Sequence, residues 1–169
     1  MTGAVAWHGG WAILPGLIVD IRNESGRLLP ELFDRVNNRW FVVGEEGSRY
    51  SIVLHNKTDS RFEIVVSVDG LDVIDGRKAS ESKRGYLLAP HSRQIIEGFR
   101  QSMHAVAAFR FSPVRESYAA EKYHNTRNVG VIGVAVFEER ASILTPDAEA
   151  RKRLKANPFP GRFANPPER

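Results

Sequence analysis

The sequence predicts an all-β fold, an antiparallel β-sandwich of immunoglobulin-like or jelly-roll type. Apolar and polar residues alternate with period two in residues 50–55 and 62–68, which is the pattern of strands with one buried face. Asp69-Gly70 is the dipeptide typical of a two-residue hairpin turn. Strand-like segments also recur about every ten residues with turn residues between them, as in sandwiches and barrels.

The first part of the domain contains two expected strands, residues 17–21 and 39–43. The polar cluster at 23–26 predicts a turn after the first strand. The segment 28–36 is ambiguous: Pro30 at a first helical position, followed by Leu32, Phe33 and Val36, is compatible with one or two helical turns.

Residues 49–76 are expected to form the central hairpin of the sandwich. Its two strands are joined by the polar segment 56–60, which has the length of a hairpin loop. A third short strand is expected at 71–74, and Asp75-Gly76 ends it with a second turn.

Further strands are expected at 86–89, 94–99 and 103–111, the last with a bulge or a shift of face near Ala107–Ala108. The polar insertion 112–128 follows, and its first part, 116–122, is compatible with a short helix. Residues 129–137 are the most apolar run of the chain, which predicts a strand in the middle of a sheet with both faces buried.

The sequence divides into an N-terminal arm (1–15), a β-sandwich domain (16–140), and a C-terminal helix with a proline-rich basic tail (141–169). The arm carries Trp7 and Trp11, which are costly to leave in water. It therefore packs either on its own domain or on another subunit, and the sequence leaves both alternatives open.

The C-terminal segment is predicted to begin as a helix with Thr145 as N-cap and Pro146 at its first position. Four prolines after residue 157 then require an extended or disordered tail. Seven basic and three acidic residues in 140–169 give this part a net charge of +4. Such a charge suggests an acidic partner, protein or nucleic acid, although a merely solvated tail is the alternative. The candidate partner-binding residues of both termini are Trp7, Trp11, Arg151, Arg153, Phe159 and Phe163.

Several classes of chemistry find no support in the sequence. The chain has no cysteine, which excludes disulfides, thiolate metal sites and thiol nucleophiles. No nucleotide-binding or hydrolase motif occurs, so we expect no catalytic residue and no cofactor. Asp69, Asp72 and Asp75 lie three apart, but the apolar residues between them favour turns over a calcium loop. The five histidines have no metal-ligand spacing, so we expect no metal.

We expect neither a signal peptide nor a transmembrane segment. No Lys or Arg precedes Arg22, the N-terminal apolar run is interrupted, and no apolar run is long enough to span a bilayer. A virion or the bacterial cytoplasm is the expected location.

One basic aromatic group in the second half of the domain is a candidate ligand site. Its arginines and tyrosines are suited to stacking on a sugar or on single-stranded nucleic acid. The site residues are Arg115, Tyr118, Tyr123 and Arg127, with Arg100 and Arg110 nearby. The alternative is structural: Arg110 pairs with an acid of a neighbouring strand and the tyrosines brace the insertion.

The patterns V-V-S-V-D-G-L and N-V-G-V-I-G-V-A-V-F, at 65–71 and 128–137, resemble a group of bacterial and phage proteins of unknown function. The resemblance covers residues 44–137 and implies no activity or site residue. We expect a non-enzymatic structural or interaction protein, an oligomeric subunit of a repetitive assembly such as a virion, in which it is a capsid, decoration or tail component. The alternative is a ligand-binding β-sandwich module, in particular a carbohydrate-binding one.

Overall fold

A computed structural model describes residues 2–8, 15–36, 38–101, 105–124 and 127–138. The chain divides into two compact units, Met1–Glu139 and Arg140–Arg169, and the fold described below is that of the first unit. The predicted C-terminal helix and tail lie outside the described residues.

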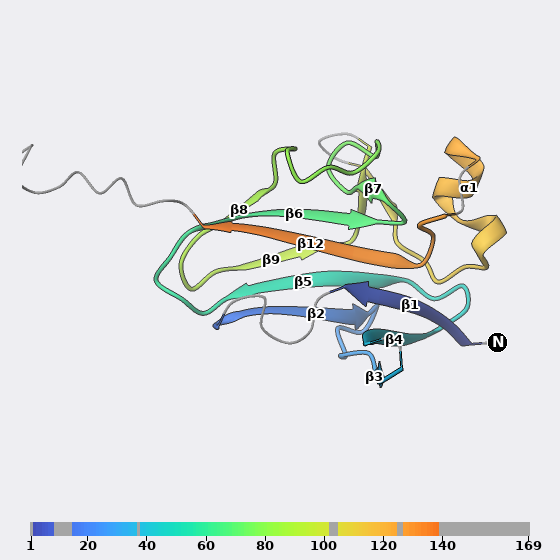
Figure 1. The fold of residues 1–169 in the computed structure, drawn as a ribbon, viewed down its shortest axis with the longest axis horizontal. Helices are drawn as coiled ribbons and strands as arrows, with labels where there is room; N and C mark the ends of the chain where they lie inside the picture. Colours follow the sequence, from blue (N-terminus) through green and yellow to red (C-terminus); the bar gives the residue numbers. More distant parts are fainter. Residues whose placement is uncertain (1, 9–14, 37, 102–104, 125–126, 139–169) are drawn as a thin grey trace, which may run out of the picture. The chain divides into compact units, whose positions relative to one another are not determined.

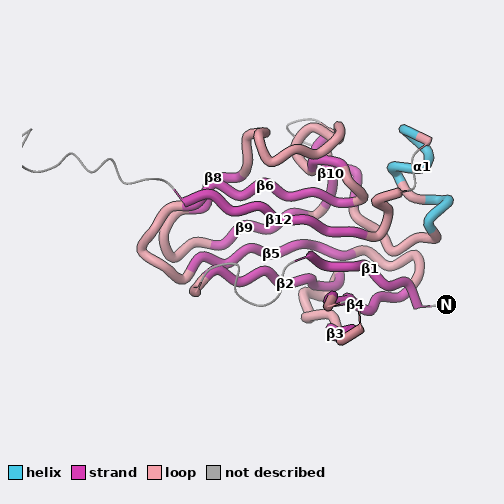
Figure 2. Tube along the Cα trace, in the orientation of Figure 1, coloured by secondary structure: helices cyan, strands magenta, loops and turns pink. Residues whose placement is uncertain are grey.

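The described part of the chain is mostly strand, with one short helix, which confirms the all-β class (Figure 1 and Figure 2). The strands are β1 Thr2–His8, β2 Leu17–Asn23, β3 Glu31–Asp34, β4 Arg39–Glu45, β5 Tyr50–Asn56, β6 Phe62–Val68, β7 Leu71–Asp72, β8 Tyr86–Leu88, β9 Arg93–Ile96, β10 Gly98–Arg100, β11 Val106–Ala108 and β12 Val131–Glu138. A 3-10 turn, η1 (Val114–Glu116), precedes helix α1 (Tyr118–Tyr123).

The strands form two main sheets and one separate hairpin. The larger sheet has seven strands in the order β3-β4-β1-β12-β6-β7, with β8 also paired to β6. The smaller sheet has the order β2-β5-β9, and β10 pairs with β11. All pairs are antiparallel except β1 with β12. Residues 2–8 of the expected N-terminal arm thus form a strand between β4 and β12 of their own chain.

Side chains of both sheets meet in one hydrophobic core. Alternate residues of β5 and β6 are buried in it, as their period-two patterns require. Strands of the two sheets therefore pack as layers around this core. The fully buried contributors include Ile21, Val42, Ile52, Leu54, Ile64, Val66, Leu88 and Ile132.

The ambiguous segment 28–36 does not contain the helical turns with which its sequence is compatible, because residues 31–34 form β3 and pair with β4. Phe33 lies opposite Trp40, and their ring centroids are 5.0 Å apart. The carbonyl of Pro30 accepts a hydrogen bond from the amide of Val43. Cross-strand pairs of this kind stabilise a strand whose own sequence is also compatible with a helix.

The prediction of a central hairpin is also wrong. β5 and β6 do not pair, since β5 belongs to the smaller sheet and β6 to the larger one. The polar loop between them carries the chain from one sheet to the other. The hairpin turn predicted at Asp69-Gly70 is confirmed: these residues have φ of 58° and 76° and join β6 to β7, as in a type I′ hairpin.

The strand at 129–137 is confirmed as β12, with β1 and β6 as its neighbours. Its expected burial on both faces is wrong: of its eight residues only Ile132 is fully buried, and Phe137 is 42% exposed. A Cβ atom on Gly133 would lie 2.6 Å from Oγ of Ser67, so this glycine allows close contact between β12 and β6. Of the other expected strands, 94–99 is divided into β9 and β10 at Glu97.

Candidate functional site

The exposed apolar residues of the described chain concentrate on the β3–β4 hairpin. Leu32 is 60% exposed and Phe33 43%, and Val36 follows in the connecting turn at 92%. Leu28, just before β3, is also exposed. Exposed apolar residues that gather on one hairpin are typical of interaction sites.

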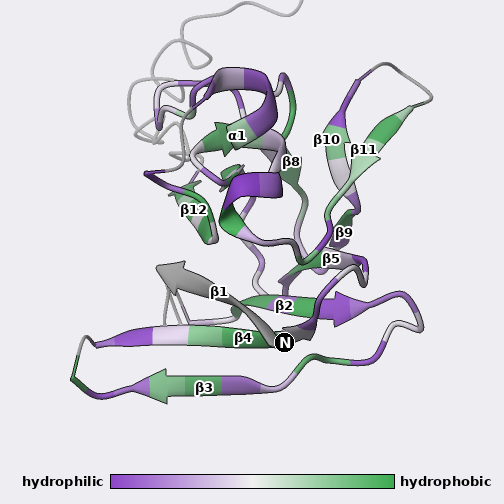
Figure 3. Ribbon diagram, turned by 90° about the vertical axis from the view of Figure 1, so that its right-hand side faces the viewer, coloured by the Kyte–Doolittle hydropathy of each residue, from purple (hydrophilic) through white to green (hydrophobic). Residues whose placement is uncertain are grey.

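Phe33 lies on the core side of the larger sheet. It shares this face with Trp40, opposite it on β4, and with Val42, which is 1% exposed. The same face therefore passes from fully buried at Val42 to half-exposed at Phe33. Figure 3 shows β3 beside β4, with hydrophobic stretches of both strands in green. Leu32 pairs with Phe41 and lies on the opposite face. Both faces of the hairpin consequently present apolar side chains.

β3 is the terminal strand of the larger sheet among the described residues. The hydrogen bond from Val43 to Pro30 shows that residue 30 faces β4 with its carbonyl group. Main-chain groups alternate in direction along an antiparallel strand. Leu32 and Asp34 therefore also bond to β4, whereas the amide and carbonyl groups of Glu31 and Phe33 point away from the sheet. At Phe33 the edge therefore presents a main-chain donor and a main-chain acceptor.

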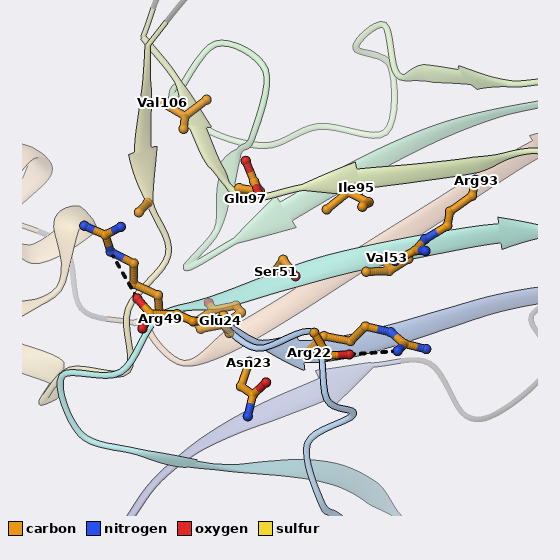
Figure 4. Close-up of a pocket in the computed structure, with 13 residues that line it drawn as sticks. Arg22, Asn23, Glu24, Arg49, Ser51, Val53, Arg93, Ile95, Glu97 and Val106 are labelled. Atoms are coloured by element: carbon orange, nitrogen blue, oxygen red, sulfur yellow. Dashed lines mark hydrogen bonds and ion pairs between the residues drawn. The ribbon is translucent and has the colours of Figure 1, made fainter.

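A second feature is a groove of about 450 Å³ on the smaller sheet (Figure 4). Its floor consists of residues of β5 and β9, among them Val53 and Ile95, and β11 contributes Val106 to its wall. Arg22 and Arg93 come from the two outer strands, on either side of β5 (Figure 4). The groove thus combines an apolar floor with charged margins.

Most of the charge around this groove is internally compensated. Arg22 bonds to Asp20 at 2.7 Å and also donates to the carbonyl of Gly26. Arg49 lies 3.5 Å from Glu24. These pairs leave the groove with little net positive charge. An apolar floor with such margins suits an extended chain of mixed polarity better than a strongly anionic ligand.

His55 lies next to the Arg22–Asp20 pair, with Nε2 3.4 Å from the Asp20 carboxylate. Burial lowers the pKa of His55 below its usual value, and the nearby cations Arg93 and Arg22 act in the same direction, against Asp20. The imidazole is therefore held mainly neutral at pH 7. It contributes polarity to this region rather than positive charge.

The tyrosines of the predicted ligand site are engaged within their own unit. Tyr118 stacks on Phe99 with ring centroids 4.9 Å apart. Its hydroxyl accepts a hydrogen bond from Nζ of Lys122 at 2.7 Å. The hydroxyl of Tyr123 donates to the carbonyl of Gly76, also at 2.7 Å. These contacts tie α1 to β10 and to the turn after β7.

The arginines of that predicted site have separate surroundings. Arg115 bonds to its neighbour Glu116 at 3.1 Å, and Arg127 is exposed on the turn before β12. Arg110 donates to the carbonyl of Gly47 rather than to an acid, and Arg100 is exposed at the end of β10. Lys122, which the sequence did not indicate, is the cation nearest the tyrosine rings, 5.0 and 5.5 Å from their centroids.

The three aspartates spaced by three residues act in turns, as the sequence suggested. Asp69 accepts from the amide of Gly130, and Asp72 accepts from the amides of Ile74 and Asp75. The carboxylate of Asp75 contacts Lys83 at 2.8 Å. Across the described ranges, no three His, Asp or Glu side chains are grouped so as to hold a metal ion.

Of the six candidate partner-binding residues in the termini, Trp7 is the one that lies within the described ranges. Trp7 belongs to β1, where its backbone pairs with Trp40 and Ile132. The other five, Trp11, Arg151, Arg153, Phe159 and Phe163, lie outside the described residues. No helix within the described ranges is long and apolar enough to cross a membrane.

Sequence reasoning missed both the β3 edge and the groove. The apolar residues from Leu28 to Val36 were compatible with a helix, which hid an edge strand. The groove residues come from four separate segments, and only the three-dimensional fold brings them together.

Comparisons with protein-family models, with curated proteins and with solved structures find no match to this chain. The function is therefore inferred from the geometry alone.

Proposed function

We propose that this chain is a non-enzymatic structural protein, a subunit of a repetitive assembly such as a virion, where it is a capsid, decoration or tail component. The observation that carries the proposal is the apolar edge of the larger sheet. It combines the outward main-chain groups of Phe33 with exposed side chains at Leu32, Phe33 and Val36.

Proteins that remain monomeric protect such edges with lysines, prolines, bulges or covering loops. In β3 the middle of the strand is Leu32-Phe33, and no lysine or proline interrupts it. Within a repetitive assembly each subunit meets identical neighbours, so small edge contacts act together and give stability through avidity. An exposed edge is therefore useful to an assembly subunit and harmful to a solitary protein.

The basic C-terminal segment supplies a second contact in this proposal. Its net charge of +4 fits an acidic partner, either a neighbouring subunit or packaged nucleic acid. If nucleic acid is the partner, its affinity for the intact chain falls steeply with rising salt. An affinity that is independent of salt would restrict this segment to protein contacts.

Sedimentation velocity of the intact chain over a wide concentration range tests the proposal. We expect the weight-average sedimentation coefficient to rise with concentration as copies associate. A Leu32→Lys/Phe33→Lys variant, with two charges on the edge, is expected to remain largely monomeric. A wild-type chain that sediments as a monomer up to about millimolar concentration, a level that corresponds to roughly 4 kcal/mol of association, would overturn the proposal.

A ligand-binding module is the second candidate, and the groove of about 450 Å³ on the smaller sheet favours it. Carbohydrate recognition through Tyr118 and Tyr123 receives less support, because both hydroxyls already have partners within the chain. A glycan array tests this candidate directly. Binding that is lost on Ile95→Arg and retained in Tyr118→Phe would assign it to the groove, and an array without hits would remove a carbohydrate ligand.

A further inference from the structure

We propose that a second cavity, of about 220 Å³, binds the primary ammonium group of a small alkylamine, with Asp69 as counter-ion and the Tyr50 hydroxyl as a further acceptor. The cavity is distinct from the groove on the smaller sheet. Its lining comes from β5, the turn after β6, the β10–β11 hairpin, the segment that follows β11, and α1. This site goes beyond the assembly proposed above and does not depend on it.

One wall of the cavity is a row of aromatic rings in mutual contact. Tyr50 stacks on Phe109 with ring centroids 5.3 Å apart, and Phe109 meets Phe99 edge to face at 5.2 Å. Phe99 stacks in turn on Tyr118 at 4.9 Å. All four residues line the cavity, together with the apolar side chain of Val68. Such a wall favours an alkyl chain, which leaves water when it binds.

Tyr50 brings an unpaired hydroxyl to this wall. The residue is 6% exposed, and its side chain shares the core side of β5 with Ile52 and Leu54. The hydroxyl has no hydrogen-bond partner within the described residues, although its oxygen is not among the fully enclosed atoms. A buried tyrosine usually finds a partner for this group. Because the side chain lines the cavity, the open surface of the hydroxyl is available there to a donor from a ligand.

Asp69 supplies negative charge to the same cavity. Its Oδ1 accepts from the amide of Gly130 at 2.7 Å, whereas its Oδ2 has no partner within the described residues. Burial raises the pKa of this carboxyl. Burial also raises the pKa of the Tyr50 hydroxyl, and the Asp69 carboxylate raises it further, so the two groups lie within electrostatic range. A bound cation would compensate the charge that no described side chain of the fold pairs with.

The available acceptors favour an ammonium over a guanidinium. A guanidinium binds a carboxylate best through two parallel hydrogen bonds, one to each oxygen. In Asp69 the amide of Gly130 already occupies Oδ1, which leaves Oδ2 for a ligand. An ammonium is a compact charge with three donors, and it can bond separately to single acceptors such as this Oδ2 and the Tyr50 hydroxyl oxygen.

The charges at the rim add to the preference for a cation. Glu116 and Glu121 line the cavity, and so does one cation, Arg110. Glu116 is paired with Arg115 at 3.1 Å, and Arg110 donates to the carbonyl of Gly47. The Glu121 carboxylate has no partner within the described residues. The rim therefore attracts a cation and repels an anion.

Titration of the full, isotope-labelled chain with n-butylammonium chloride at constant ionic strength tests the proposal by nuclear magnetic resonance. We expect saturable changes in the amide resonances of Asp69, Ala108 and Gly130. For so small a ligand the dissociation constant should be on the order of millimolar. 1-Butanol, which has the same chain but no charge, should bind at least about tenfold more weakly. Changes that do not saturate, or equal binding of the alcohol, would overturn the proposal.

Two isosteric variants and one control assign the site. Asp69→Asn removes the charge but keeps the shape of the side chain, so the affinity for the amine should fall by at least about tenfold. Tyr50→Phe removes only the hydroxyl and should weaken binding several-fold. The control is Asp75→Asn in the neighbouring turn, where the carboxylate contacts Lys83 at 2.8 Å, and it should bind like the wild type.

Unchanged affinity in Asp69→Asn, or an equal loss in Asp75→Asn, would contradict the site. The amide spectrum of each variant shows whether it is folded, and the comparison of amine with alcohol on the wild-type chain needs no variant. Sedimentation separates this inference from the proposed function. A chain that stays monomeric but binds the amine keeps the site and removes the assembly, and a chain that associates but does not bind the amine does the reverse.

Discussion

Asn56 is the residue that allows the chain to leave one sheet and enter the other. Its side chain, 2% exposed, donates to the carbonyls of Ser60 and Ala89 at 2.8 Å. Its Oδ1 accepts from the amide and the hydroxyl of Thr58. The loop after β5 is thereby fixed in a shape that a hairpin turn does not have. The buried amide thus holds the loop between the sheets, while β5 makes its ladder hydrogen bonds with β2 and β9 and β6 makes its own with β12, β7 and β8.

Replacement of this residue should be costly. Asn56→Ala leaves several buried main-chain groups without partners, and we expect the free energy of unfolding to fall by about 3 kcal/mol. Asp59→Ala in the same loop is the control, because the Asp59 side chain is fully exposed and its change should be small. Chemical denaturation measures both variants, and similar stabilities for the two would contradict the role given to Asn56.

Asp69 offers a pH-dependent prediction at the same scale. Burial raises the pKa of its carboxyl group, and the hydrogen bond from Gly130 acts against that effect. A raised folded-state pKa means that the folded chain binds the proton more strongly than the unfolded chain. The stability linked to this group is therefore present at low pH and is lost as the pH rises through the folded-state pKa.

Asp69→Asn keeps the side-chain acceptor and the tolerance of positive φ at this turn, but it removes the buried charge. We expect the variant to be more stable than the wild type near neutral pH, and this gain to disappear in acid, below the usual range of the carboxyl pKa. Thermal unfolding over a pH series provides the measurement. A stability difference that does not change with pH would show that the charge of Asp69 is not responsible.

At the scale of elements, the sequence predicted those strands that bury one face and in which apolar and polar residues alternate regularly. The alternation in β5 and β6, and the Asp69-Gly70 turn, depend on local physics that the sequence contains. β3 was not predictable, because its apolar residues fit a helix equally well and only the pairing with β4 decides. β1 has no clear period, and its place between β4 and β12 depends on contacts distant in sequence.

Less of the candidate site could be predicted. Tyr118 and Tyr123 were predicted as residues of a ligand site, with bracing of the insertion as the alternative. Their contacts to Phe99 and Gly76 agree with that alternative. The β3 edge was missed, because a strand lies at the edge of a sheet only as a result of the order of all the strands. No pattern within residues 28–36 indicates that order. The groove likewise depends on which strands are neighbours.

The packing of β4 on the segment after β11 yields a prediction. Gly44 is buried, and a Cβ atom built on it would lie 2.2 Å from the ring of Phe111. Gly44→Ala should therefore destabilise the fold by about 2 kcal/mol through overpacking. In a Phe111→Leu background the added methyl group has more room, so the same change should cost less. A double-mutant cycle by urea denaturation measures this coupling, and additive effects would contradict it.

At the scale of the whole described unit, the two sheets differ in size. The larger sheet has seven strands and the smaller one three. The core face of the larger sheet is fully buried at Val42 but half-exposed at Phe33, one strand further out. The unit thus ends in an apolar edge that its own described residues do not cover. Association of copies through this edge follows from the fold and does not require a separate binding domain.

Residue-resolved amide hydrogen exchange at increasing protein concentration tests association through the β3 edge most directly. Leu32 and Asp34 bond to β4, so their amides should be protected at every concentration. The amide of Phe33 points outward, and we expect its exchange to slow as copies associate. Exchange at Phe33 that remains equally fast at all concentrations, while the chain associates, would contradict association through the β3 edge.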